Sequence, residues 1–499
     1  MITPIEIDVA SLNLASLAPM MVAIVGALVI LCIDLVSKPK HSDKHFYVVL
    51  TTLFLLIDLG TIIGYGGPTR GFFDVMLVDG ISLLSQAIIV VASGLFIFLS
   101  LSKVRFHEYK YPEYFALFLF MTAGFQFMAA SDNLILIFVG LETASLSLYT
   151  MIAMHNKDKA IEAAIKYFTM GALAAGFYAF GSMILYYLTG SIELGVIAQH
   201  FAATNYENYT FILVAVVFMI GAIGFKLSLV PFHIWAPDVY EGSSAAMAGY
   251  IAIVPKMAIL VVAIRFFSIF ISADDSWVEG ILWAMAVVTM TLPNMIALVQ
   301  TDVKRMLAFS SISHAGFVLV AIMLGTTQAI GGLFLYWILF AFVVLGAFAM
   351  LWVHRTKEEP SYYGLKSDYD FNKFTGLVKI APTSAFIIGI LMFALAGVPP
   401  FSVFFGKMYL ISATVNSGEI LLAIIMVLNS AIAAFYYLKL IVYMFLRQRE
   451  DGTELEYQDM NSIILKVIIG IAVACAVTAI FWLSTILDIV NTAVQTSGF

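Results

Sequence analysis

Long apolar stretches alternate with short polar ones along almost the whole chain. An apolar stretch of about 20 residues is long enough to cross a bilayer as a helix. The sequence predicts such spans near residues 15–36, 46–65, 80–101, 112–130, 133–154, 160–189, 209–232, 243–270, 277–299, 304–325, 329–353, 376–414, 419–446 and 462–487. Several are longer than a bilayer requires, so those helices are expected to tilt or break. The pattern predicts an all-α polytopic membrane protein with about 14 transmembrane helices.

Two of these spans are interrupted by proline. In the seventh, Lys226 is followed by the run LSLVPFH, and in the twelfth, Pro399 and Pro400 precede Lys407. Helices that are five spans apart cross in opposite directions, which is the arrangement of an inverted repeat. We therefore expect broken helices seven and twelve, and two inverted five-helix repeats. The predicted divisions are 1–110 (three N-terminal helices), 111–270 (first repeat), 271–447 (second repeat) and 448–499 (C-terminal helix).

Basic residues gather on alternate connections between the spans. They are Lys38, Lys40, Lys44, Lys103, Arg105, Lys110, Lys157, Lys159, Lys304, Arg305, Arg355, Lys357, Lys366, Lys373, Arg447 and Arg449. Connections rich in lysine and arginine face the cytoplasm, so both termini are expected outside. The connection HIWAPDVYEG would be cytoplasmic by count, but it carries no lysine or arginine and gives no information on orientation.

The composition agrees with a membrane protein and excludes several kinds of site. Hydrophobic residues make up 62% of the chain and charged residues 11%, against about 45–50% apolar residues in soluble domains. The two cysteines, Cys32 and Cys475, lie far apart in apolar spans, which excludes a disulfide framework or a metal cluster built on them. The sequence lacks a dinucleotide-binding fingerprint and a P-loop. We expect no metal, cofactor or nucleic acid to bind this chain itself.

Three lysines within separate spans, Lys226, Lys256 and Lys407, are the strongest sign of function. A lysine at mid-bilayer depth costs about 2.5–3.5 kcal/mol on insertion scales. A desolvated lysine can lose its proton and regain it when a carboxylate approaches. Chance snorkelling to an interface does not explain three lysines in separate spans. They predict a chain of proton sites.

Glu142 is the one carboxylate in the middle third of the central spans, within LIFVGLETASLSLYT. An unpaired charge is disfavoured there, so Glu142 is expected either to be protonated or to pair with a cation, for which Lys226 is the candidate. A static ion pair is the alternative without a transport role.

Other ionisable residues have two interpretations each. Glu162 and Lys166 stand four residues apart, which suits either a proton entry site or a plain helix-end ion pair. His314 is either a neutral relay between lysines or a structural histidine. His233 is open in the same way, and Lys439 is more simply a snorkelling lysine. Asp34, Asp58 and Asp488 are expected to be solvated or to cap helices.

Five motifs resemble one known family. GLETASLSLYT, AIKYFTMGALAAG, GFKLSLVPFHIWAPDVYEG, QTDVKRMLAFSSISHAGF and GVPPFSVFFGKMYL occur in order between about residues 110 and 445. They look like the antiporter-like N-type subunits of bacterial respiratory complex I, the proton-pumping NADH:quinone oxidoreductase. Lysine at position 407 is similar to the N-type pattern, because M-type subunits have glutamate there.

The resemblance implies a proton-translocating subunit in which each five-helix repeat forms half a channel. It places the key positions on Glu142, Lys166, Lys226, Lys256 and Lys407. It also implies a bacterial inner membrane location, neighbouring antiporter-like and peripheral subunits, and FMN, iron–sulfur clusters and quinone in those partner subunits. Two alternatives remain: a subunit of a Mrp-type Na⁺/H⁺ antiporter without redox chemistry, and a scaffold whose lysines carry no ion.

Overall fold

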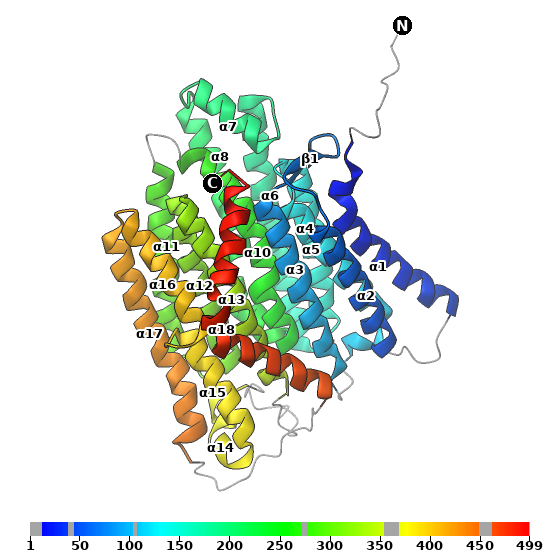
Figure 1. The fold of residues 1–499 in the computed structure, drawn as a ribbon, viewed down its shortest axis with the longest axis vertical. Coiled ribbons are helices and arrows are strands. Elements are labelled where there is room, and N and C mark those ends of the chain that lie inside the picture. Colours follow the sequence, from blue (N-terminus) through cyan, green and yellow to red (C-terminus); the bar gives the residue numbers. More distant parts are fainter. Residues whose placement is uncertain are drawn as a thin grey trace.

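The computed structural model describes residues 12–37, 44–102, 107–271, 277–353, 369–448 and 462–498 (Figure 1). Among these residues, 12 helices are long and apolar enough to cross a membrane. The helix α4 (Pro112–Ala129) and the broken pair α15 (Pro382–Ala396) and α16 (Ser402–Asn416) correspond to the other two predicted spans. The expected all-α polytopic fold is confirmed.

The N-terminal unit consists of three helices and a small hairpin. Its elements are η1 (Leu14–Leu17), α1 (Ala18–Ser37), α2 (Lys44–Ile63), β1 (Thr69–Gly71), β2 (Met76–Val78), α3 (Gly80–Ile97) and η2 (Phe98–Leu101). The strands are antiparallel, with Thr69 opposite Val78 and Gly71 opposite Met76. Asp79 caps α3 by accepting a hydrogen bond from the Ser82 N–H, as expected for an aspartate at this position.

The next elements are η3 (Glu108–Lys110), which precedes the predicted first repeat, and the helices within that repeat. Those helices are α4, α5 (Leu134–Ala153), α6 (Asp158–Thr189), α7 (Leu194–Ala203), α8 (Tyr209–Leu227), α9 (Trp235–Gly242) and α10 (Ala245–Ile271). Helix α7 occupies a connection between spans, and α9 is a two-turn helix outside the candidate spans. The run HIWAPDVYEG is thus mostly helical rather than a plain loop.

The second repeat and the last helix complete the chain. Their elements are α11 (Trp277–Leu298), α12 (Val303–Leu324), α13 (Thr327–Val353), η4 (Phe371–Phe374), α14 (Leu377–Ile380), α15, α16, α17 (Ile420–Phe445) and α18 (Ile463–Gln495). The first part of α18 runs across the lower end of the bundle before the helix turns upward (Figure 1). It ends beside the start of α3, where the Ile81 N–H donates to Ser497 Oγ at 2.8 Å.

Corresponding helices pack together in both repeats. The first and second helices of each repeat are in contact, α4 with α5 and α11 with α12. The first and fifth are also in contact, α4 with α10 and α11 with α17, and the third packs against the broken fourth. Because each repeat has an odd number of crossings, the second runs through the membrane in the opposite direction to the first.

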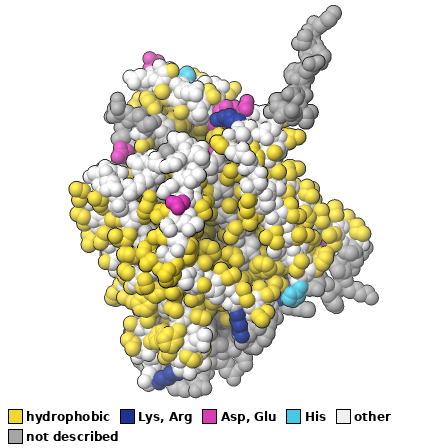
Figure 2. Space-filling model, in the orientation of Figure 1, with side chains coloured by type: hydrophobic (Ala, Val, Ile, Leu, Met, Phe, Trp, Pro, Cys, Tyr) yellow, Lys and Arg dark blue, Asp and Glu magenta, His cyan; other side chains and the backbone are white. Residues whose placement is uncertain are grey.

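The centre of the bundle is formed by α10, α12 and α13. In the most apolar 18-residue stretch of each of these helices, 100%, 94% and 83% of the residues are buried. The corresponding share is 39% in α6, α11 and α17. The outer helices therefore present their remaining side chains outward, and the face in Figure 2 is largely hydrophobic, with few charged side chains. Lys256 in α10 and His314 in α12 consequently lie in the interior of the bundle.

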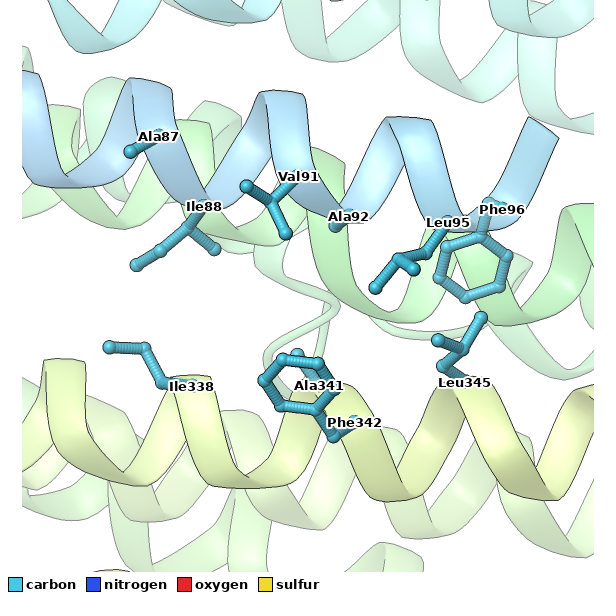
Figure 3. Close-up of a pocket in the computed structure, with 10 residues that line it drawn as sticks. All are labelled: Ala87, Ile88, Val91, Ala92, Leu95, Phe96, Ile338, Ala341, Phe342 and Leu345. Atoms are coloured by element: carbon cyan, nitrogen blue, oxygen red, sulfur yellow. The ribbon is translucent and has the colours of Figure 1, made fainter. Parts of the chain in front are cut away.

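Between α3 and α13 lies an apolar cavity of about 200 Å³ (Figure 3). Its lining is Ala87, Ile88, Val91, Ala92, Leu95, Phe96, Ile338, Ala341, Phe342 and Leu345. None of these side chains binds a proton, and none is among the candidate site residues considered next.

Some of the basic residues that indicate the orientation of the chain lie outside the described residues. The basic residues Lys38, Lys40, Lys103, Arg105, Arg355, Lys357, Lys366 and Arg449 do not belong to the described residues. The structure does place the beginning of α1 and the end of α18 toward the same end of the bundle (Figure 1).

Candidate functional site

Both predicted helix breaks are present, and each stands beside a lysine. Helix α8 ends at Leu227, one residue after Lys226, and Ser228 has a left-handed backbone conformation with φ of 62°. Helix α15 ends at Ala396, and α16 starts six residues later and contains Lys407. A helix end leaves carbonyl groups without intrahelical donors. In the first break, Trp235 Nε1 donates to the Phe225 carbonyl at 2.9 Å.

The ammonium group of Lys226 is buried among neutral groups. Its Nζ donates to Ser145 Oγ at 2.6 Å and to Tyr149 OH at 3.3 Å, both on α5. It also lies 5.7 Å from the ring centre of Tyr149 and 5.9 Å from that of Tyr167. Within the described part of the chain it forms no ion pair. Hydroxyl and aromatic groups can stabilise a cation without fixing it as a carboxylate would.

Glu142 lies on the same face of α5 as these two partners. Glu142, Ser145 and Tyr149 are spaced by three and four residues, so Glu142 is about 4.5 Å from Ser145 along the helix axis. Its Oε1 atom is buried without a hydrogen-bond partner among the described residues. In this conformation Lys226 bonds the next turn of α5 and forms no ion pair with Glu142 among the described residues, which leaves a protonated Glu142 as the other expected state.

Lys256 is bound by α12 at the centre of the bundle. Its Nζ donates to the Ser311 main-chain oxygen at 2.9 Å and to Ser311 Oγ at 2.8 Å. Ser311 Oγ is also 3.2 Å from Tyr240 OH, which belongs to α9 of the first repeat. Lys256 is 1% exposed, so these neutral oxygens replace the water that an ammonium group would otherwise bind.

His314 occupies the next turn of α12. Its Nε2 is 3.1 Å from Tyr437 OH of α17, and its Nδ1 is hydrogen-bonded to Tyr336 OH of α13. Tyr437 OH is in turn hydrogen-bonded to Ser310 Oγ. A neutral imidazole with hydroxyl partners on both nitrogens can accept a proton on one side and release one on the other. These hydroxyl partners fit both interpretations of His314, a neutral relay and a hydrogen-bonded structural histidine.

Lys407 belongs to α16 and contacts α12 one turn beyond His314. Its Nζ is 5.5 Å from the ring centre of Phe317, which is three residues beyond His314. The same Nζ donates to the Ala396 carbonyl at 3.3 Å, at the end of α15. Ser311, His314 and Phe317 therefore form one face of α12 between Lys256 and Lys407, because residues three apart are neighbours on a helix.

Lys166 and Glu162 belong to a charged cluster of six residues. Lys166 Nζ is 2.8 Å from Glu162 Oε1 and 3.0 Å from Asp238 Oδ2. Arg305 Nη1 binds Asp238 at 2.9 Å and Glu241 at 2.8 Å, and Lys159 reaches Glu241 at 3.1 Å. A cavity of about 110 Å³ opens between these side chains. The acidic groups of HIWAPDVYEG are thus neutralised by lysines of α6 and an arginine of α12.

The comparison with known families decides where the chain belongs. Residues 131–433 match the family described as NADH:quinone oxidoreductase/Mrp antiporter, TM. The chain belongs to this family. The matched region contains Glu142, Lys226, Lys256 and Lys407, and both helix breaks.

Relatives and solved structures agree with this membership. The NADH-quinone oxidoreductase subunit N of Sulfurimonas denitrificans is 54% identical over 100% of both chains. A chain of respiratory complex I from Thermus thermophilus has a TM-score of 0.78 at 24% identity, covering 95% of this chain and 100% of that one. A chain of the Mrp complex from Dietzia sp. DQ12-45-1b has a TM-score of 0.80 at 18% identity and 97% coverage of both. These structural likenesses show a fold shared by both kinds of complex.

Sequence reasoning missed or misplaced several buried polar groups of this family member. Asp58, expected to be solvated or capping, is fully buried and accepts hydrogen bonds from Gln126. Arg265 of α10 is buried and pairs with Asp79 at 2.9 Å. Asn294 Nδ2 donates to Asn429 Oδ1 at 3.2 Å between α11 and α17. In sequence, each of these is a single polar residue in an apolar run, and only the fold supplies its partner.

The two remaining candidates have different surroundings. Lys439 Nζ donates to the Leu298 and Gln300 carbonyls at 3.2 and 3.0 Å, so it stabilises the end of α11 rather than joining the lysines. His233 lies in the first break, and its Nδ1 is buried without a partner in the described part of the chain.

Proposed function

We propose that this chain is the proton-exporting, N-type antiporter-like subunit of an NADH:quinone oxidoreductase. The curated relatives support this assignment, since proteins 54% identical over their full length carry that name. The fold alone does not separate this complex from the Mrp antiporters, because chains of both superimpose closely on it.

The observation that carries the proposal is the row of buried lysines. Lys226, Lys256 and Lys407 are 8%, 1% and 4% exposed, and each donates only to neutral oxygen atoms within the described residues. A cation buried without a counter-ion is costly, whereas the neutral amine is not. Each lysine is therefore suited to release and regain a proton during a transport cycle.

The contacts suggest how the proton moves. Glu142 modulates the charge of Lys226, because a shift of the lysine by one turn of α5 would pair it with that carboxylate. Lys256 joins the two half-channels through Ser311, with Tyr240 on the first-repeat side and His314 beyond it. His314 passes the proton toward Lys407, which loads or releases it on the exit side. Glu162 and Lys166 serve the entry side.

The direction of transport and the energy source follow from general constraints. In the proposed orientation the basic connections face the cytoplasm of a bacterial inner membrane and both termini lie outside. In the proposed role, protons leave the cell. Moving a unit charge against the membrane potential costs about 2.3 kcal/mol per 100 mV. Electron transfer in partner subunits, through FMN, iron–sulfur clusters and quinone, supplies that energy, and neighbouring antiporter-like subunits transmit it.

Proton uptake into inverted membrane vesicles, driven by NADH, tests the proposal. Glu142→Gln and Lys226→Ala are expected to lower uptake per NADH oxidised while the complex still assembles. Lys379→Ala, which removes an exposed lysine of α14, is the matched control and should leave uptake unchanged. Normal uptake in both buried-site variants would refute the role given to this pair.

The alternative is a cation/proton antiporter subunit without redox chemistry, which the likeness to the Mrp complex favours. Mild-detergent purification of the tagged chain separates the two. Elution with flavin, iron–sulfur absorbance and NADH:quinone activity supports the respiratory complex. Elution with hydrophobic subunits alone, together with sodium-dependent proton transport, supports the antiporter.

A further inference from the structure

Asp58 is a fully buried carboxyl group outside the row of lysines. It lies on α2 in the N-terminal three-helix unit and faces Gln126 of α4. Gln126 Nε2 is 2.8 Å from Asp58 Oδ1 and 3.0 Å from Oδ2. Gln126 is itself fully buried, so the two side chains form an isolated polar pair between two transmembrane helices.

The elements packed against α2 bring no cation to Asp58. The elements with the main contacts to α2 are α1, α3, α4 and η2. Their described ionisable groups, including the Asp79 cap of α3, are Cys32, Asp34, Asp79, Glu113 and Tyr114. Asp34 contacts Tyr47 near the start of α2, which is about 16 Å along the helix from Asp58. Phe115, next to Tyr114 on α4, stacks on Tyr47. Asp79 is held by Arg265 at 2.9 Å.

A carboxylate in this position is expensive. Burying a charge in the hydrocarbon region without a counter-ion favours its neutral form, and an intramembrane carboxyl group with no structural counter-ion indicates function. One amide N–H donor offsets only part of that cost. Asp58 is therefore suited to hold a proton.

The Gln126 side chain also has an acceptor for the protonated form of Asp58. Gln126 Oε1 is buried and has no hydrogen-bond partner among the described residues. A protonated Asp58 has an O–H to donate, and the amide oxygen is the acceptor that it needs. A half-turn of the amide about its last side-chain bond exchanges the N–H donor for this acceptor. The pair thus has a hydrogen-bonded arrangement for each protonation state of the acid.

We propose that Asp58 and Gln126 form a reversible proton-binding site between α2 of the N-terminal three-helix unit and α4 of the first repeat, separate from the lysine row. The proton binds one carboxylate oxygen, and the only other change is the rotation of the Gln126 amide. The site does not depend on the pumping role proposed above, since it concerns a different pair of helices and binds its proton whether or not the lysines conduct.

Infrared difference spectroscopy of the purified chain, together with the subunits that accompany it, tests this site. Wild-type protein at neutral pH should show the carbonyl stretch of a protonated carboxylic acid, and the band should shift after transfer to D₂O. Asp58→Asn should remove that band. Asp488→Asn, which changes an exposed carboxyl group of α18, should leave it in place.

A second variant keeps the test decisive if Asp58→Asn fails to assemble. Gln126→Leu removes the acceptor, so the same band should move to the frequency of a carboxylic acid without a hydrogen bond. The proposal is overturned if neither variant alters any carboxylic acid band between acid and neutral pH. It is also overturned if the band never shifts in D₂O, because a proton that does not exchange is a structural one.

Discussion

Lys407 donates a hydrogen bond from its Nζ to the main-chain oxygen of Ala396, 3.3 Å away across the break between α15 and α16. Ala396 is the last residue of α15, and its carbonyl has no partner within the helix. The negative end of the helix dipole also favours a cation there. The proline-induced break therefore creates a binding position for the lysine ammonium group.

Replacing this lysine by arginine separates a structural role from a proton-carrying one. Lys407→Arg keeps the positive charge and the donors that reach the Ala396 carbonyl, but a guanidinium group does not release its proton. We expect the complex to assemble and proton uptake per NADH to fall about as far as in Lys407→Met. Lys379→Arg is the control on an exposed site. A scaffold role for Lys407 predicts normal uptake in the arginine variant.

The hydroxyl group of Tyr437 is expected to matter for transfer between His314 and its surroundings. Tyr437→Phe removes the hydrogen bonds to His314 Nε2 and Ser310 Oγ and leaves both without that partner. An orphaned buried polar group costs about 1–3 kcal/mol, which corresponds to a slowing of about fivefold or more if it falls on the transfer step. Stopped-flow measurement of proton uptake checks this.

Tyr178→Phe is the matched control for that measurement. Tyr178 is also a buried tyrosine, but its hydroxyl group donates to the Leu134 carbonyl at 3.1 Å, away from the lysines. It should change stability without changing the uptake rate. Equal slowing in both tyrosine variants would assign the effect to packing rather than to the relay.

The charged cluster around Asp238 predicts a pH dependence of stability. Burial raises the pKa of Asp238, but its hydrogen bonds to Lys166 and Arg305 outweigh burial and lower the pKa overall. Glu241 is lowered in pKa in the same way, against burial, by Lys159 and Arg305. A lowered folded-state pKa gives stability that is complete above the unfolded value of about 4 and is lost as the pH falls through the folded value.

Asp238→Asn should therefore be less stable than the wild type at neutral pH, with the difference shrinking below about pH 4. Thermal unfolding in detergent across this pH range measures it. Asp488→Asn alters an exposed carboxyl group and should follow the wild-type profile. A difference that stays constant with pH would exclude an ionic contribution from the cluster.

The site residues that the sequence predicts are those that are disfavoured inside an apolar membrane span. Lysines inside apolar spans and prolines beside them are costly wherever the chain folds, so Lys226, Lys256, Lys407 and both breaks were predicted. The partners were not. Ser145, Ser311 and Ala396 are ordinary residues in sequence, and only the fold brings them within hydrogen-bond distance of the lysines.

The same limit applies to Glu142 and Asp58. Lys226 is the candidate partner of Glu142 if that carboxyl group is charged, yet in this conformation the lysine reaches the next turn of α5. Asp58 is expected from its place near the end of a span to be solvated or to cap a helix, but α4 covers that position and supplies Gln126. Neither distance along a helix nor charge alone fixes which neighbour a side chain meets.

The most direct test of the account is the number of protons translocated per NADH oxidised by the complex in proteoliposomes, measured for Lys256→Ala beside wild type and Lys379→Ala. Lys256 is the lysine bound to Ser311 between the two half-channels. Passage of the proton through Lys256 predicts a lower ratio in Lys256→Ala alone, with the complex intact. An unchanged ratio in that variant would show that the proton does not pass through the buried lysines.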